Sequence, residues 1–86
     1  MSKSLKFKHV YHIFPSFDNT FVLQAKTLNG DYQIAHVDPS GGLRFIVNDL
    51  NGKYSAMLSP FVFLTLIDNQ SISFIDLKKQ NCITKS

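Results

Sequence analysis

The chain has 86 residues, a formal net charge of +3, 44% hydrophobic residues and 17% charged residues. This length holds a single domain, which excludes large catalytic scaffolds such as α/β barrels and doubly wound sheets. The composition also excludes a disordered tail, which has too few hydrophobic residues, and a coiled coil, which has more charged ones.

Residue usage favours strands joined by tight turns. The chain has eight Phe, seven Ile, five Val and three Tyr, but only three Ala and no Glu. Aromatic and β-branched side chains fit a half-buried pleated surface, whereas Ala and Glu are helix formers. All six acidic residues are Asp, and there are six Asn. Because these short side chains bond to their own backbone, they favour turns over helix interiors.

Alternating hydrophobicity predicts three strands in the first half of the chain. The first covers residues 5–14 and ends at a break that begins with Pro15; the second covers residues 20–28. Asn29-Gly30 predicts a two-residue hairpin loop, because both residues accept the positive φ that such a loop needs. A third strand at residues 32–37 follows it.

Two further turn signals divide the middle of the chain. The segment 38–42, Asp-Pro-Ser-Gly-Gly, predicts a turn, because proline presets φ and glycine accepts left-handed conformations. A strand at residues 43–50 follows. Asn51-Gly52 then predicts a second hairpin, which leads into a strand at residues 53–58.

The most hydrophobic segment, residues 61–67, follows Ser59-Pro60. Its β-branched and aromatic residues predict a strand; the alternative is one short helix near residues 60–67, with Ser59 as its N-cap. Because both faces of such a strand are apolar, we expect a second layer, a short helix or another chain to cover it. A turn at 68–70 and a strand at 71–77 complete the predicted elements.

These elements predict an all-β, mainly antiparallel fold. We expect a meander of six or seven strands that forms a small barrel or a two-layer sandwich, without an internal repeat. Residues 1–4 are expected to be a flexible basic N-terminus, residues 5–77 one compact domain, and residues 78–86 a flexible basic tail. A single cysteine, no signal-peptide pattern and no apolar run near 20 residues predict a cytoplasmic protein without membrane contact.

Residues that could support catalysis or metal binding do not form a known pattern. His9 and His12 are three apart, so on a strand they point to opposite faces. His36 and Asp38 would share a face, but a His–carboxylate pair needs a nucleophile or a metal to act. Cys82 lies outside any CxxC spacing, and is expected to be a free, exposed thiol. We therefore expect a protein that is not an enzyme and that uses no cofactor or metal.

The positive charge is concentrated at the two ends of the chain. Residues 9–77 contain three basic residues and six Asp, which gives a net charge of −3. Residues 1–8 and residues 78–86 each contain three lysines. If the ends lie close together, they form one basic patch suited to phosphate or to an acidic protein surface. The candidate residues for anion or nucleic-acid binding are Lys3, Lys6, Lys8, Lys78, Lys79, Lys85 and Arg44.

The sequence favours a small protein-binding module. Its small size, rigid hairpins, hydrophobic strand and lack of a catalytic constellation fit a protein that acts by binding a macromolecular target. Usage rich in Asn, Lys, Ile and Phe, typical of AT-rich coding sequence, suggests a bacterial or phage source, where such a protein is an inhibitor, immunity or accessory protein. The candidate interface residues, for a protein target or a homodimer, are Phe61, Val62, Phe63, Leu64, Leu66 and Ile67. The alternatives are a small-barrel nucleic-acid-binding protein that uses the terminal lysines, and a structural subunit of a larger assembly.

Overall fold

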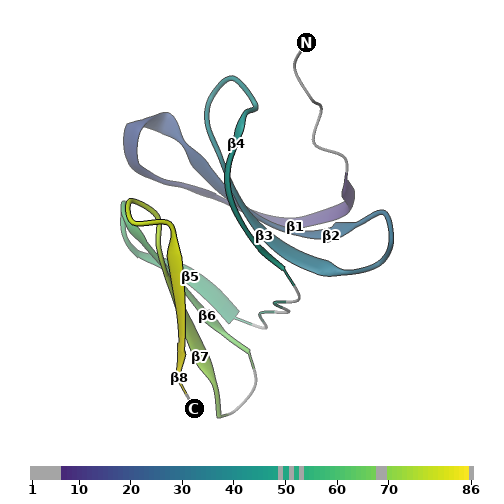
Figure 1. Cartoon of the computed structure of the whole chain (residues 1–86), viewed down its shortest axis with the longest axis vertical. Coiled ribbons are helices and arrows are strands. Elements are labelled where there is room, and N and C mark those ends of the chain that lie inside the picture. Colours follow the sequence, from purple (N-terminus) through teal and green to yellow (C-terminus); the bar gives the residue numbers. More distant parts are fainter. Residues whose placement is uncertain (1–6, 49, 51, 53, 68–69, 86) are drawn as a thin grey trace.

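The computed structural model describes residues 7–48, 50, 52, 54–67 and 70–85. Their strands form two four-stranded antiparallel sheets, each arranged in chain order (Figure 1). The first sheet contains β1 (Phe7–Pro15), β2 (Phe21–Thr27), β3 (Tyr32–Val37) and β4 (Leu43–Asn48). The second contains β5 (Tyr54–Ser59), β6 (Val62–Leu66), β7 (Ile72–Asp76) and β8 (Asn81–Lys85). One turn of 3-10 helix, η1 (Phe17–Asn19), connects β1 to β2.

The predicted all-β antiparallel class is confirmed, while the barrel and the strand number are wrong. Two separate sheets form, and neither closes into a barrel. The segment 62–66 is a strand, so the helix alternative is also wrong. The eighth strand lies in the segment expected to be a tail, because Asp76 Oδ1 accepts hydrogen bonds from the Lys78 and Lys79 amides, at 3.1 and 3.0 Å, and organises a turn there. Cys82, a free cysteine, is therefore half-buried in β8 against the core.

The β2–β3 hairpin has a three-residue loop, not the predicted two-residue one. The Thr27 amide donates to the Asp31 carbonyl at 2.8 Å, and the Gly30 amide donates to the Thr27 carbonyl at 3.0 Å. Gly30 alone in this loop has a positive φ, at 91°. This is a type I turn followed by one left-handed residue, an arrangement that requires glycine at one position only.

The β3–β4 loop is built in the same way around Gly41, whose φ is 88°. Its first residue, Asp38, also holds the loop together through its side chain. Asp38 Oδ1 accepts hydrogen bonds from the Ser40 hydroxyl at 2.6 Å, the Gly42 amide at 2.8 Å and the Ser40 amide at 3.0 Å. These bonds, the Ser40 hydroxyl above all, lower the pKa of Asp38 below its ordinary value.

The hairpin predicted at Asn51-Gly52 is wrong, because β4 and β5 belong to different sheets. Asn51 lies outside the described residues. Leu50 is buried in the core, and the Gly52 carbonyl accepts a hydrogen bond from Gln24 Nε2 at 2.6 Å. A Cβ added at Gly52 would lie 1.7 Å from Thr65 Oγ1, so this crossing between sheets requires glycine. Packing of Leu50 and Gly52 against distant residues therefore outweighs the preference of an Asn-Gly pair for a hairpin turn.

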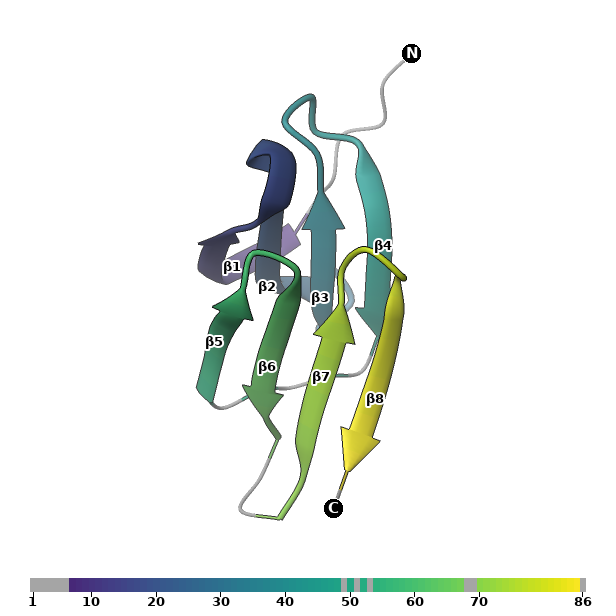
Figure 2. The ribbon, with the colours of Figure 1, turned by 90° about the vertical axis from the view of Figure 1, so that its left-hand side faces the viewer.

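The two sheets are stacked in the same orientation. Figure 2 shows β5 to β8 in order in front of β1 to β4 in the same order, with β3 and β7 pointing the same way. Two sheets stacked in this way bury opposite faces. The face of the first sheet that is covered corresponds to the face of the second sheet that points outward.

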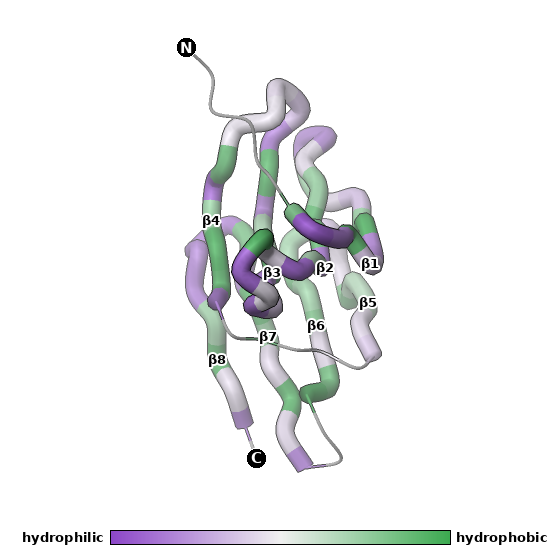
Figure 3. Tube along the Cα trace, turned by 90° about the vertical axis from the view of Figure 1, so that its right-hand side faces the viewer, coloured by the Kyte–Doolittle hydropathy of each residue, from purple (hydrophilic) through white to green (hydrophobic). Residues whose placement is uncertain are grey.

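The core lies between the sheets. Hydrophobic residues recur along the strands of both sheets (Figure 3), and those that point inward form one cluster. Its buried members are Val22, Ile34, Leu50, Phe63, Ile75 and Leu77. The rings of Phe14 and Phe63 meet edge to face at 5.3 Å, which joins β1 to β6. Burial of each large hydrophobic side chain contributes about 1.5–3 kcal/mol. Within the part of the chain described, no helix is long and apolar enough to cross a membrane.

Candidate protein-binding surface

The second sheet buries one face and leaves the other uncovered. Phe63 and Thr65 on β6, and Ser73 and Ile75 on β7, are almost completely buried against the first sheet. Side chains alternate along a strand, so the residues between them point away from the first sheet. This outward face is built by all four strands of the sheet.

The strand register sorts the outward residues into rows. In one row, Leu66 is paired with Tyr54 of β5 and Ile72 of β7. In the next row, Leu64 is paired with Ala56 of β5 and Phe74 of β7, and Phe74 is paired in turn with Ile83 of β8. We call the apolar outward residues the open face of the second sheet: Tyr54, Ala56, Leu58, Val62, Leu64, Leu66, Ile72, Phe74 and Ile83. Of these, Tyr54 is 73% exposed, Leu58 57% and Ile83 51%. Asp76 and Lys85 are the charged residues in the same rows.

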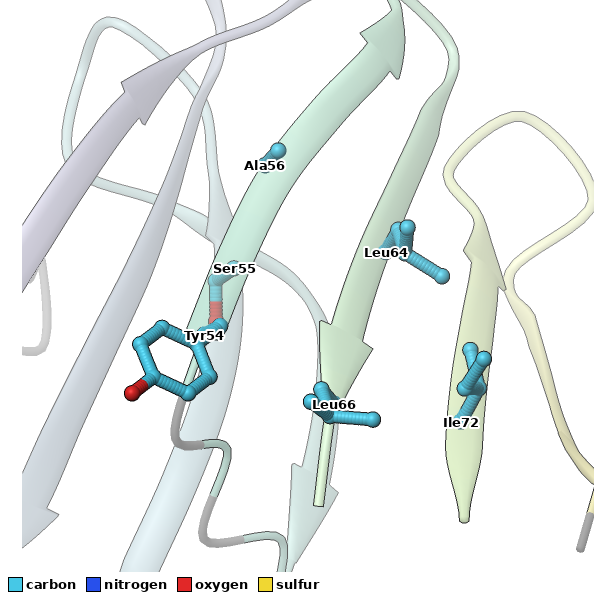
Figure 4. Close-up of a pocket in the computed structure, with 6 residues that line it drawn as sticks. All are labelled: Tyr54, Ser55, Ala56, Leu64, Leu66 and Ile72. Atoms are coloured by element: carbon cyan, nitrogen blue, oxygen red, sulfur yellow. The ribbon is translucent and has the colours of Figure 1, made fainter. Parts of the chain in front are cut away.

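A shallow apolar hollow of about 290 Å³ lies on this open face. It is lined by Tyr54, Ser55, Ala56, Leu64, Leu66 and Ile72. Figure 4 shows Leu64, Leu66 and Ile72 of β6 and β7 beside Ala56 and Tyr54 of β5. No charged side chain lines the hollow, so it suits the apolar side chains of a partner surface and not a polar substrate.

The predicted interface residues divide between the two faces. Val62, Leu64 and Leu66 lie on the open face, whereas Phe63 is in the core and Ile67 packs against it. The open-face residues of β5, β7 and β8 were missed by sequence reasoning. The available signals were the alternation in residues 71–77, which puts Ile72 and Phe74 on one face, and that in residues 53–58, which puts Tyr54 and Ala56 on one face.

Phe61, the remaining predicted interface residue, belongs to a cluster of rings and cations that joins the sheets. Its ring lies 5.3 Å from the Phe17 ring, centroid to centroid. The Lys78 ammonium is 4.9 Å from the Phe61 ring, and the Arg44 guanidinium is 5.7 Å from the Phe17 ring. The Phe17 amide also donates to the Pro60 carbonyl at 3.0 Å. These two cations therefore already face aromatic rings, where they stabilise the contact between η1 and the β5–β6 turn.

The structure places three of the other predicted basic residues, Lys8, Lys79 and Lys85. Lys3 and Lys6 lie outside the described residues, and Lys8 is near the start of β1. Lys79 and Lys85 are separated by the length of the five-residue strand β8, which is about 16 Å at the usual rise. The expectation that the two ends of the chain form one basic patch therefore stays a prediction, because Lys3 and Lys6 lie outside the described residues.

His36 is buried with a hydroxyl network at one end of the first sheet. Its Nε2 lies 2.9 Å from Thr20 Oγ1, and the Ser16 hydroxyl lies 2.5 Å from the same oxygen. Since the Thr20 hydroxyl donates to the Phe17 carbonyl, we assign the imidazole proton to Nε2 as a donor to Thr20. Burial, with Arg44 as a second cause, lowers the pKa of His36.

This network lacks the geometry of a catalytic triad. Nδ1 of His36 is buried, and no hydrogen-bond partner for it is found among the described residues. A general base that activates a hydroxyl is normally oriented by a third group at this nitrogen. Nor do three or more His, Cys, Asp or Glu side chains come together as metal ligands in the described ranges. The hydroxyl–imidazole network is best explained as a polar part of the core.

Comparison of the chain with protein-family models, with curated proteins and with solved structures found no match. The open face of the second sheet is therefore the feature of the molecule that best indicates its function.

Proposed function

We propose that this chain is a non-enzymatic protein-binding module whose contact surface is the open face of the second sheet. The observation that carries the proposal is the continuous set of nine apolar residues on that one face. A soluble monomer rarely exposes an apolar patch that continues over four adjacent strands. In contrast, apolar patches with charged residues at the margin are typical of protein interfaces.

The chemistry of the face defines the partner class. The rows contain only two charged side chains, Asp76 and Lys85, among the described residues. A partner must therefore present a flat, largely uncharged surface, of which the apolar face of another β-sheet is the simplest example. Because association itself costs several kcal/mol, such a partner must cover several of these side chains at once. Both an inhibitory module and an assembly subunit would use a surface of this kind.

Two substitutions of the same chemistry test the proposal. Leu64→Asp places a charge at the centre of the open face, whereas Leu28→Asp places it in the exposed β2–β3 loop, away from that face. Proteins retained by the tagged chain from its source cells would be purified and titrated back by calorimetry. We expect Leu64→Asp to weaken binding at least about tenfold, Leu28→Asp to leave it unchanged, and the heat-capacity change of binding to be negative.

Equal binding by both variants would contradict the proposal. Binding to nucleic acid that weakens steeply with salt would also contradict it, because such a dependence indicates phosphate contacts. Circular dichroism and urea unfolding of both variants would show that each one is folded before binding is compared.

A further inference from the structure

The two sheets repeat one structural unit, although the sequence shows no evident repeat. Both are four-stranded meanders in chain order and in the same orientation (Figure 2). When β2 is matched to β6, Phe21-Val22 falls on Phe61-Val62. Phe21 is paired with Val37 across the first sheet, and the Phe61 carbonyl accepts a hydrogen bond from the Leu77 amide at the matching position. The repeat is therefore one of topology and register.

Under this match, positions that belong to the core in the first sheet correspond to positions on the outer surface of the second sheet. Val22 corresponds to Val62, and Ile34, paired with Gln24, corresponds to Phe74, paired with Leu64. Ile34 is 2% exposed because the second sheet covers it. Phe74 occupies the same position, yet it belongs to the open face. The open face of the second sheet is therefore as hydrophobic as the corresponding face of the first sheet, which another sheet covers.

The reverse holds for the outward face of the first sheet. Its residues Leu23, Ala35 and Val37 correspond to Phe63, Ile75 and Leu77, which are all buried in the core. The apolar residues on this side that keep solvent exposure are Val10, Ile13, Phe21, Leu23, Leu43 and Ile46, and we call them the open face of the first sheet. Ala25, Ala35 and Val37 on the same side are already buried within the chain, at 1%, 0% and 7% exposed. Ile13 is 61% exposed and Leu43 46%.

Polar positions match as well. On the buried face of the second sheet, one row carries hydroxyls that bond in pairs: Ser55 with Thr65 at 2.8 Å and Ser73 with Thr84 at 2.7 Å. Ser73 corresponds to Gln33, whose Nε2 donates to Asn48 Oδ1 at 2.7 Å on the open face of the first sheet. Both faces therefore have a hydrophobic row beside a polar row whose groups are already paired.

We propose that the chain associates with itself head to tail. The open face of the second sheet of one copy packs on the open face of the first sheet of the next copy, which repeats the sheet-to-sheet interface already present within the chain. This inference rests on the proposed protein-binding function and names a second copy of this chain as the partner. In stacks of repeated units, the terminal units have polar outer faces. Here both outer faces are apolar, so neither is a cap.

Head-to-tail contacts leave one face of each kind free until the assembly closes. If the contact between copies repeats the contact within the chain, each sheet is rotated from the previous one by the same angle. Four-stranded sheets arranged in this way around an axis form closed rings of about four to eight sheets. Since each copy supplies two sheets, we propose a closed ring of about two to four copies.

Light scattering of the purified full chain tests the oligomer. We expect a single mass of about two to four chains at concentrations up to about 100 μM. Ile13→Asp on the first open face and Leu64→Asp on the second should each shift the mass toward the monomer. Leu28→Asp, in the loop, should not. An equimolar mixture of the two face variants should form a dimer only, because one intact contact remains between them.

Three results would overturn the head-to-tail ring. They are a monomer at every concentration, an assembly broken by Leu64→Asp but not by Ile13→Asp, and a mass that grows without limit. The second result would mean that two second sheets face each other. Leu43→Asp and Ile83→Asp, at exposed positions of the same two faces, replace any variant that fails to fold. A monomer whose binding to another protein is still lost in Leu64→Asp would overturn self-association and leave the proposed function standing.

Discussion

The two sheets share a topology but differ in what they bury. The covered face of the first sheet carries two large polar side chains, Gln24 and His36, whereas the buried polar residues of the second are small hydroxyls, Thr65 and Ser73, beside Phe63 and Ile75. The second sheet also keeps large apolar side chains on its open face. This difference teaches that the stacking of sheets, not hydrophobicity alone, decides which apolar residues become core. Neighbouring residues of one strand should therefore respond very differently to the same substitution.

The sharpest contrast is between Phe63 and Leu64 on β6. Phe63→Ala removes a completely buried ring and should lower the free energy of unfolding by about 3–5 kcal/mol. Leu64→Ala on the open face should cost about 1 kcal/mol or less in the isolated chain, because no cavity is left behind. Urea unfolding at a concentration where the chain is monomeric measures both. Equal losses would contradict the assignment of the two faces.

The crossing between the sheets should tolerate no side chain at Gly52. Gly52→Ala places a methyl group against Thr65 Oγ1, and should cost about 1–3 kcal/mol through forced displacement of packed groups. The double variant Gly52→Ala/Thr65→Ala should lose less than the sum of the two single losses, because the clash is relieved. Additive losses in the same unfolding assay would argue against this contact.

The buried polar group of the first sheet should make stability depend on pH. The pKa of His36 is lowered from 6.5 in the folded chain, so unfolding takes up a proton when the pH falls below 6.5. The free energy of unfolding should therefore fall from pH 7.5 to 5.5, by at most about 1.4 kcal/mol per pH unit for this single group. His36→Gln should flatten this slope, because it removes the imidazole whose pKa burial lowers. A slope that persists in His36→Gln would assign it to other groups.

The cation–ring contact should have the smallest effect. Lys78→Ala removes the ammonium above the Phe61 ring and should cost about 0.5–1 kcal/mol. Lys79→Ala is the matched control, because both residues donate only their backbone amides to Asp76 Oδ1. The unfolding temperatures of the two variants measure this difference. An equal fall in both would show that the contact between Lys78 and the Phe61 ring contributes nothing to stability.

Much of the fold could be predicted locally, and apart from the length of the β2–β3 loop the errors share one cause. Alternation predicted the strands up to residue 77, and the glycines marked the turns. The errors arose where distant segments decide the outcome. Asn51-Gly52 reads as a hairpin but crosses between sheets, since Leu50 is buried in the core. The last strand was missed because its pairing with β7 is not encoded in the hydrophobicity of residues 81–85.

The candidate surface was predicted in part for the same reason. The sequence showed that both faces of residues 61–67 are apolar and that something must cover them. It could not show that the Phe63 face is covered from within the chain while the Leu64 face is open, because a strand of this composition satisfies either arrangement. It also could not collect Tyr54, Phe74 and Ile83 onto that face, since their proximity depends on strand register.

By itself, the amino-acid sequence determined the β class, the positions of most strands and turns, and the excess of apolar surface on residues 61–67, because local backbone preferences and alternation express all three. Only the tertiary structure decided that the strands divide into two stacked sheets and which face each sheet leaves open. That decision depends on pairing and packing between residues far apart in the chain. Alternating hydrophobicity shows that a strand has an apolar face, but not which surface will cover it.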